Sequence, residues 1–157
     1  MKPLISVGAK DLRLAACAQP ILAVDDMTPF GEYDPDLSFE ASVPLRYYLM
    51  KVNRRPPVVA AMTRHRQVTQ CLASAEAKPW WIVVAPPERS AVELVPEDLL
   101  LVRMEPFEGL KMHLGCWHAG PFFKQSSGLF FNLELADTNI NDHGLHSLNV
   151  QVPLVLA

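Results

Sequence analysis

The sequence predicts an all-β protein in which residues 1–157 form one antiparallel sandwich or barrel with one or two short helices. There are 14 prolines against 7 glycines, and proline interrupts long helices. The apolar segments are short and end at proline, glycine or polar clusters, which is typical of strands. Helices do not alternate with these segments as a parallel sheet requires, and no repeat or low-complexity tract divides the chain.

Nine segments have this strand pattern. The first, 45–53, is rich in aromatic residues and ends before Arg54-Arg55-Pro56-Pro57. Segment 80–85 (Trp-Trp-Ile-Val-Val-Ala) is apolar throughout and is closed by Pro86-Pro87. In chain order the predicted strands are 45–53, 58–62, 69–73, 80–85, 99–104, 110–113, 117–119, 129–135 and 148–156.

Two segments favour a short helix instead. Residues 10–18 are rich in alanine and leucine, and residues 87–94 could form a turn or two before Pro96 stops them. Between the first helix and the first strand, residues 25–39 carry two prolines, a glycine and several acids, so we predict a loop there.

Composition and charge exclude several classes of partner. The formal net charge of −3 gives no electrostatic reason to expect nucleic acid or an anionic membrane. The longest wholly apolar run, 80–85, is far shorter than a membrane span, and the N-terminus lacks the apolar stretch of a secretory signal. Cys17, Cys71 and Cys116 are an odd number without CxxC spacing, which favours free thiols. We therefore expect a cytoplasmic protein that acts on a small molecule.

Residues 109–123 are the candidate active-site segment, because His113 and His118 lie five residues apart with Gly115 between them. On one straight strand those two side chains would point to opposite faces. A turn at 114–116 removes this conflict, since two short antiparallel strands would then bring both imidazoles to one cavity. Trp117 would form a wall of that cavity.

The same segment resembles a known family. Pro106-Phe107-Glu108-Gly109 followed by His113 resembles the second cupin motif, in which a proline–glycine turn leads into a strand with a ligand histidine. Residues 109–123 also resemble the ureidoglycolate lyase family, whose pattern is glycine, three residues, His-x-x-x-Trp-His and then a proline. Further pieces follow in family order over about 45–142. They are Val52-Asn53-Arg54, Arg64-His65, Thr69-Gln70, the strand 81–85 and the segment 130–134.

This resemblance implies a cupin-like (RmlC-like) barrel and a homodimeric lyase. Such an enzyme splits ureidoglycolate to glyoxylate and urea in the recycling of purine and allantoin nitrogen. The site residues implied are, for catalysis, His65, His113 and His118 and, for substrate binding, Arg64, Gln70, Lys111 and Trp117.

Histidine suits this reaction because its unperturbed pKa lies near 6.5. The substrate is a carbinolamine, so a base must take its hydroxyl proton as the C–N bond breaks, and an acid must protonate the leaving urea. By resemblance, His113 and His118 are the acid–base pair or metal ligands. Arg64 and His65 are neighbours on a strand and cannot both face inwards unless the strand is bulged, and we expect His65 to face in.

A divalent metal stays open as a cofactor, because cupins commonly bind one through two or three histidines and a glutamate. His65, His113 and His118 could supply three nitrogens, and imidazole suits nickel, zinc, iron or manganese. The first-motif His-x-His of cupins is missing, since Arg66 and Gln67 follow His65. A cage of four protein ligands is therefore not predicted.

The chain departs from the family pattern at several positions. Thr63 replaces a glutamate, Arg66 a proline and Val68 a glycine, and Ala119-Gly120 separates the second histidine from the proline that follows it. These departures motivate two alternatives. One is a non-catalytic cupin domain that binds a small carboxylate, and the other is a cupin enzyme with another small polar substrate.

Other features have structural interpretations. His143 and His146 lie in a polar turn beyond the family's core, and we predict surface positions for both. Cys116 is predicted to be a small buried side chain, because no cysteine hydrolase pattern surrounds it. Trp80 and Trp81 face opposite sides of a strand, so one should meet the core and the other a second layer or a partner.

Overall fold

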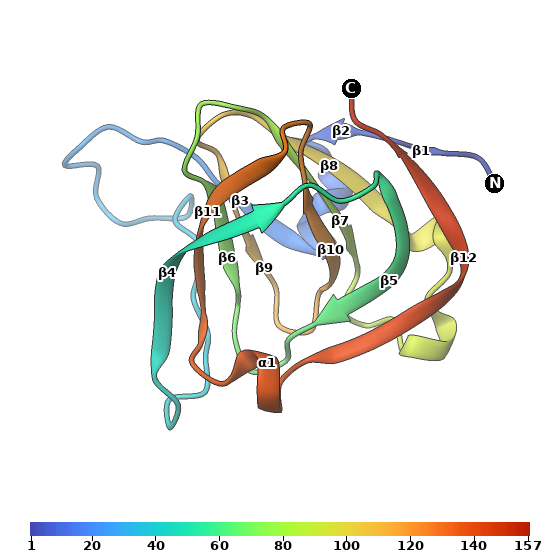
Figure 1. Cartoon of the computed structure of the whole chain (residues 1–157). Coiled ribbons are helices and arrows are strands. Elements are labelled where there is room, and N and C mark those ends of the chain that lie inside the picture. Colours follow the sequence, from blue (N-terminus) through green and yellow to red (C-terminus); the bar gives the residue numbers. More distant parts are fainter.

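The computed structural model of the protein describes residues 1–157 and is nearly all β (Figure 1). Its twelve strands form a sheet of seven and a sheet of five, arranged as a cupin-like barrel or sandwich, which confirms the predicted fold class. The helical elements are the single α-helix α1 (Thr138–Asn141) and the 3₁₀ turns η1 (Leu12–Ala16), η2 (Ala91–Glu93) and η3 (Pro96–Asp98). None of these helices has the length and apolar character needed to cross a membrane.

The seven-stranded sheet has the order β1-β12-β5-β10-β7-β8-β2 and is strongly curved, so that it forms a nearly closed barrel. Its outermost pairs, β1 with β12 and β2 with β8, are parallel, and the pairs between them are antiparallel. The strands of this sheet are β1 (Leu4–Ile5), β2 (Val7–Gly8), β5 (Val58–Arg64), β7 (Trp80–Ala85), β8 (Leu100–Met104), β10 (Trp117–Phe122) and β12 (Gly144–Val155).

The five-stranded sheet has the order β3-β9-β6-β11-β4 and is antiparallel throughout. Its longest ladder joins β11 to the edge strand β4 over nine residue pairs, from Ser127 with Asn53 to Leu135 with Leu45. The strands of this sheet are β3 (Ala18–Ile21), β4 (Leu45–Asn53), β6 (Cys71–Ser74), β9 (Gly109–Met112) and β11 (Ser127–Leu135).

Strand β7 is buried along its whole length because each of its faces contacts a different core. Its even-numbered side chains, Trp80 to Val84, pack between the two sheets against residues such as Phe130. Its odd-numbered side chains, Trp81 to Ala85, pack in a second core inside the curl of the seven-stranded sheet. The two tryptophans thus divide between two layers, as the alternation of a strand requires.

The predicted strands agree with the observed ones to within four residues, and 45–53 and 80–85 coincide with β4 and β7. The predicted helices at 10–18 and 87–94 contain only the single turns η1 and η2. Three N-terminal strands were not predicted. Of these, β1 and β2 have two residues each, and β3 contains Pro20, which demotes a strand prediction.

The sequence predicted that the turn at 114–116 joins two antiparallel strands of one sheet, and this prediction is wrong. The turn connects β9 in the five-stranded sheet to β10 in the seven-stranded sheet and is therefore a corner of the barrel. Gly115 has φ 76° there, and its N–H donates to the His65 carbonyl at 2.7 Å. A glycine turn in a sequence is compatible with a hairpin or a corner, and only the packing of the two sheets distinguishes them.

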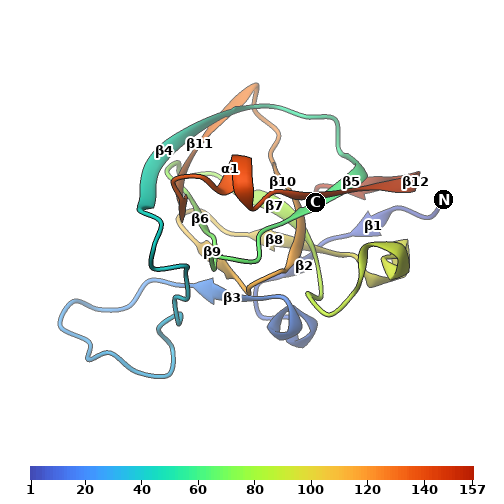
Figure 2. The ribbon, with the colours of Figure 1, turned by 90° about the horizontal axis from the view of Figure 1, so that it is seen from below.

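Three connections meet at the end of the barrel that carries α1, which Figure 2 shows from below. They join β5 to β6, β9 to β10 and β11 to β12. Gly115 of the second is bonded to His65 of the first, and His65 is bonded in turn to the Asp142 carbonyl of the third. This end of the barrel is therefore tied together by the backbone and the imidazole of His65.

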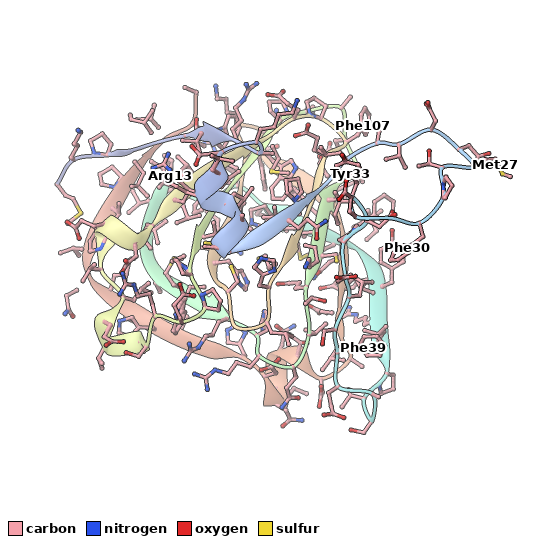
Figure 3. All side chains as sticks on the ribbon, turned by 180° about the vertical axis from the view of Figure 1, so that it is seen from behind. Arg13, Met27, Phe30, Tyr33, Phe39 and Phe107 are labelled. Atoms are coloured by element: carbon pink, nitrogen blue, oxygen red, sulfur yellow. The ribbon has the colours of Figure 1, made fainter.

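The segment between β3 and β4 leaves the barrel as a long loop, in agreement with the loop predicted at 25–39 (Figure 3). Met27, Phe30 and Tyr33 are exposed along it, and Met27 lies at its tip. The loop returns to the barrel at Phe39, which forms a β-bridge with Val68.

Gly109 in β9 tests how closely the five-stranded sheet is packed. A Cβ at this position would lie 2.9 Å from the Ala73 Cβ and 3.3 Å from the Ile21 Cβ, on the two neighbouring strands. We expect Gly109→Ala to lower the free energy of unfolding by about 1–3 kcal/mol, because overpacking forces backbone shifts. Gly8→Ala is the matched control, since no atom lies within 4 Å of its Cβ. Equal stabilities of the two variants in urea denaturation would contradict this packing.

Candidate functional site

Three histidines come together at the α1 end of the barrel. His118 on β10 pairs in register with Val84 and Thr63, so it faces the interior between the two sheets. His65 follows β5 directly, and its ring centroid lies 5.2 Å from that of His118. The ring of His143, in the connection after α1, lies 5.7 Å from that of His65.

Backbone carbonyls fix the hydrogen positions of the two inner rings. His65 Nδ1 lies 2.6 Å from the Asp142 carbonyl oxygen, and a carbonyl only accepts, so Nδ1 carries the hydrogen. His118 Nδ1 has the same relation to the Cys116 carbonyl at 3.3 Å. Each neutral ring therefore keeps a lone pair on Nε2, which can accept a proton.

Burial keeps both inner imidazoles neutral at physiological pH. It lowers the pKa of His118 from 6.5 to about 3, and the neighbouring His65 adds to that shift. His118 keeps some accessible surface, but protein atoms crowd it on most sides. Burial also lowers the pKa of His65. The hydrogen bond to Asp142 and the charges of Asp142 and Glu134 raise this pKa and so offset part of the effect of burial. These interactions therefore stabilise the protonated form of His65.

The opposite wall of the interior carries a hydrogen-bonded network on β11 and β4. Glu134 is buried and accepts from the Tyr48 hydroxyl at 3.2 Å, the Asn132 amide at 3.0 Å and the Gln70 amide at 3.4 Å. The Arg46 guanidinium lies 3.9 Å from Glu134 and 3.6 Å above the Tyr48 ring. The inner face of the five-stranded sheet is thus polar at this end of the barrel.

Gln70 leaves one acceptor free in this network. Its Nε2 donates to Asn132 at 3.0 Å and to Glu134, which fixes the orientation of the amide. Its Oε1 is buried without a hydrogen-bond partner, and the residue is 8% exposed. An unpaired buried acceptor costs about 1–3 kcal/mol. The oxygen is closed to solvent, so a ligand N–H would recover this cost only after neighbouring side chains moved to admit it.

Asp142 holds the histidine-bearing connections in place. Its carboxylate accepts from the backbone N–H groups of Arg66 and Gln67, each at 2.8 Å, while its carbonyl accepts from His65. One of these three hydrogen bonds fixes the ring orientation of His65, and the other two hold the backbone that follows it. Asp142 itself is buried, so these bonds do not compete with water.

The structure divides the seven predicted site residues among three places. One group lies around the interior, a second lies on the outer face of the five-stranded sheet, and a third lies on the face of the seven-stranded sheet turned away from the interior. His65, His118 and Gln70 lie around the interior. His113 and Lys111 lie on the outer face of the five-stranded sheet. Arg64 and Trp117 lie on the face of the seven-stranded sheet that is turned away from the interior.

His113 and Lys111 face outwards because they alternate with Leu110 and Met112, which belong to the core between the sheets. His113 Nε2 donates to the Ala15 carbonyl at 2.9 Å, and its Nδ1 lies 3.4 Å from Lys111 Nζ. The corner between β9 and β10 thus places His113 against η1. The expected pairing of this residue with His118 in one cavity is not formed.

Sequence reasoning missed several residues of this site, among them Arg46 and Asp142. The polar side chains of Tyr48, Asn132 and Glu134 stand at inward positions of predicted strands, and the alternation of those strands could have indicated them. His143 is exposed, as predicted for a surface turn, yet its ring lies beside His65. No local signal marks this contact, because it depends on two distant connections meeting.

The three histidines considered as possible metal ligands are not brought together. His113 uses Nε2 on a backbone carbonyl and lies outside the interior that His65 and His118 share. No group of three or more histidine, cysteine, aspartate or glutamate side chains is arranged to hold a metal ion. This set of histidines therefore does not fit a metal centre.

A comparison with protein-family models finds no match, and no curated protein is significantly similar to the chain. The resemblance to ureidoglycolate lyases therefore rests on the residue pattern alone. The geometry of His65, His118 and Gln70 is the independent source of evidence on function.

The lowered pKa of His118 makes stability depend on pH. The unfolded chain binds a proton there near pH 6.5, whereas the folded chain resists protonation down to about pH 3. The contribution of His118 to the free energy of unfolding is therefore complete above pH 6.5 and is lost as the pH falls toward 3. We expect the free energy of unfolding to fall by about 2 kcal/mol between pH 7 and 5 through this residue. In chemical denaturation, His118→Gln should reduce that fall, and an unchanged slope would contradict the assignment.

Proposed function

We propose that this protein is a cupin-fold lyase that cleaves ureidoglycolate, or a closely related carboxylated ureide, to glyoxylate and urea. The observation that carries the proposal is His65, a buried neutral imidazole with a free Nε2 lone pair beside a polar interior. The unpaired Oε1 of Gln70 supports a substrate with N–H donors. The resemblance of residues 109–123 to the ureidoglycolate lyase pattern supports the same substrate class through His118, whereas His113 of that pattern lies outside the interior.

The reaction transfers one proton from oxygen to nitrogen. The reacting carbon bears a hydroxyl, a carboxylate and a urea nitrogen. As a base removes the hydroxyl proton, the oxygen forms the C=O bond of glyoxylate and the C–N electron pair leaves on the urea nitrogen, which then takes a proton. Atoms and charge balance without water or a redox partner. One base that returns its proton is therefore sufficient.

His65 is assigned as this base. Its Nδ1–H is held by the Asp142 carbonyl, so its Nε2 is the position that takes and returns the proton. The charges of Asp142 and Glu134 stabilise the imidazolium formed in between. His118, with a pKa of about 3, stays neutral and is a poor proton donor, so its Nε2 accepts a hydrogen bond from the substrate. This assignment replaces the pair of His113 and His118 expected from the sequence.

The network on the opposite wall binds the rest of the substrate in this proposal. Gln70 Oε1 accepts an N–H of the ureido group, since its amide nitrogen is already committed to Asn132 and Glu134. Arg46 supplies the guanidinium for the carboxylate, because its side chain is half exposed and lies at the edge of the same network. Neither assignment needs the outward-facing Lys111.

The finer expectations on pathway, compartment and assembly are part of the same proposal. A ureidoglycolate lyase acts in the recycling of purine and allantoin nitrogen, and we place this one in the cytoplasm as a homodimer. The outer face of β4 and β11 supports the dimer, because Tyr47 and Phe131 stack there at 5.8 Å and both are exposed. Leu45 and Leu49 extend this apolar face along β4.

Replacing His65 tests the proposed mechanism. Incubation of the purified protein with ureidoglycolate should release urea and glyoxylate above the spontaneous rate. His65→Asn should lower kcat/KM by about 10²–10⁴-fold, because it removes the general base. The rate should rise with pH to a plateau already reached at neutral pH, since the pKa of His65 is lowered from 6.5.

His113→Asn is the matched control, because it alters a histidine of the same motif that faces away from the interior. We expect it to keep kcat/KM within a few-fold of the wild-type value. No release of products by the wild type, with or without added divalent metal, would overturn the lyase assignment. Binding of the substrate without turnover would instead support the non-catalytic alternative.

A further inference from the structure

A surface pocket of about 450 Å³ lies beside the histidine site, on the side of β5 opposite to His65. Polar side chains from the end of β5 and from the β5–β6 and β11–β12 connections dominate it, and one aromatic ring forms part of its wall. Its charged, polar and aromatic lining comprises Arg64, Arg66, Gln67, Trp117, Asn141, Asp142 and His143. This size is within the range of small-molecule sites.

Arg64 is the central residue of the pocket. Its guanidinium lies 4.1 Å above the Trp117 ring and donates to the Arg89 carbonyl at 3.4 Å. Partial burial and the neighbouring charge of Arg66 both lower the pKa of Arg64, so its positive charge is destabilised in the empty pocket. A bound anion would remove this cost.

No carboxylate of the chain forms an ion pair with Arg64 or Arg66. Four of the eight arginines form ion pairs, and they are Arg13, Arg46, Arg89 and Arg103. Arg64 and Arg66 form none. Asp142 lies at the pocket wall, but both of its carboxylate oxygens accept backbone N–H groups, from Arg66 and Gln67. Two guanidinium groups therefore face the same space without a counter-charge of their own.

We propose that this pocket binds a small polyvalent oxyanion, held between the guanidinium groups of Arg64 and Arg66. A doubly charged ligand matches two cations, and guanidinium groups bind oxyanions through paired N–H donors. His143 and Asn141 add hydrogen-bonding groups at the rim. The site shares Asp142 and His143 with the surroundings of His65, but Arg64 points to the other face of the sheet. It does not depend on the proposed lyase reaction, because its anion is not the reacting group.

Gly144 leaves room for Arg64 in this position. It pairs in register with Arg64, and a Cβ there would lie 3.2 Å from the Arg64 Cγ and 3.8 Å from its Nε. Gly144→Ala should therefore displace the Arg64 side chain while keeping its charge. This variant separates a defined geometry from a general electrostatic attraction.

Isothermal titration calorimetry of the full chain with inorganic phosphate, malonate and acetate tests the proposal. We expect phosphate or malonate to bind with a Kd of about 1 mM or lower, and acetate to bind at least about 10-fold more weakly. Tighter phosphate binding would identify the ligand as a phosphate compound, and tighter malonate binding as a dicarboxylate. Arg64→Gln and Arg66→Gln should each weaken binding by about 10-fold, because each removes charge-assisted hydrogen bonds.

Arg54→Gln is the matched control, since Arg54 is exposed, lacks an ion pair and lies outside the pocket. It should leave the affinity unchanged, whereas Gly144→Ala should weaken it. The proposal is overturned if neither divalent anion binds, or if the variants of Arg64 and Arg66 bind as tightly as the Arg54 variant. Loss of lyase activity in the assay above would leave this result untouched, because binding is measured directly.

Discussion

The double-sided burial of β7 is the constraint on which the rest of the structure depends. A strand with apolar side chains on both faces must have a layer on each side, or one row of them would meet water. The five-stranded sheet covers the row that begins at Trp80, and the curl of the seven-stranded sheet covers the row that begins at Trp81. The curl also brings β10 and β5 to one side of the interior, where His118 and His65 meet.

The site exists because the two walls of that interior have different chemistry. One wall presents neutral imidazoles, whose charged forms are disfavoured by burial. The other presents the carboxylate of Glu134, which is stabilised by donors from Tyr48, Asn132 and Gln70. A base beside fixed donors and acceptors can transfer a proton within a small polar substrate, and the low local dielectric strengthens each contact. The acidic and imidazole groups of these walls are not arranged in a set of three that could hold a metal ion.

Asp142 links the proposed catalytic site to the proposed oxyanion site. It orients the His65 ring through its carbonyl and holds the backbone of Arg66 through its carboxylate. The two sites therefore share a support but use opposite faces of β5, because neighbouring side chains on a strand point in opposite directions. Arg64 and His65 could not serve one pocket, and the fold assigns each its own.

The sequence by itself determined the fold class, most strand positions and the inward orientation of His65, because strand alternation and proline punctuation are local properties. The sequence also placed His118 correctly on a strand. It wrongly placed His113 in the same interior. The cause of this error is the turn at Gly115, because a glycine turn in a sequence is compatible with a hairpin or with a corner between two sheets. Only the packing of the two sheets made it a corner. The same packing brought His143 beside His65, since contacts between distant connections leave no periodic trace in a sequence.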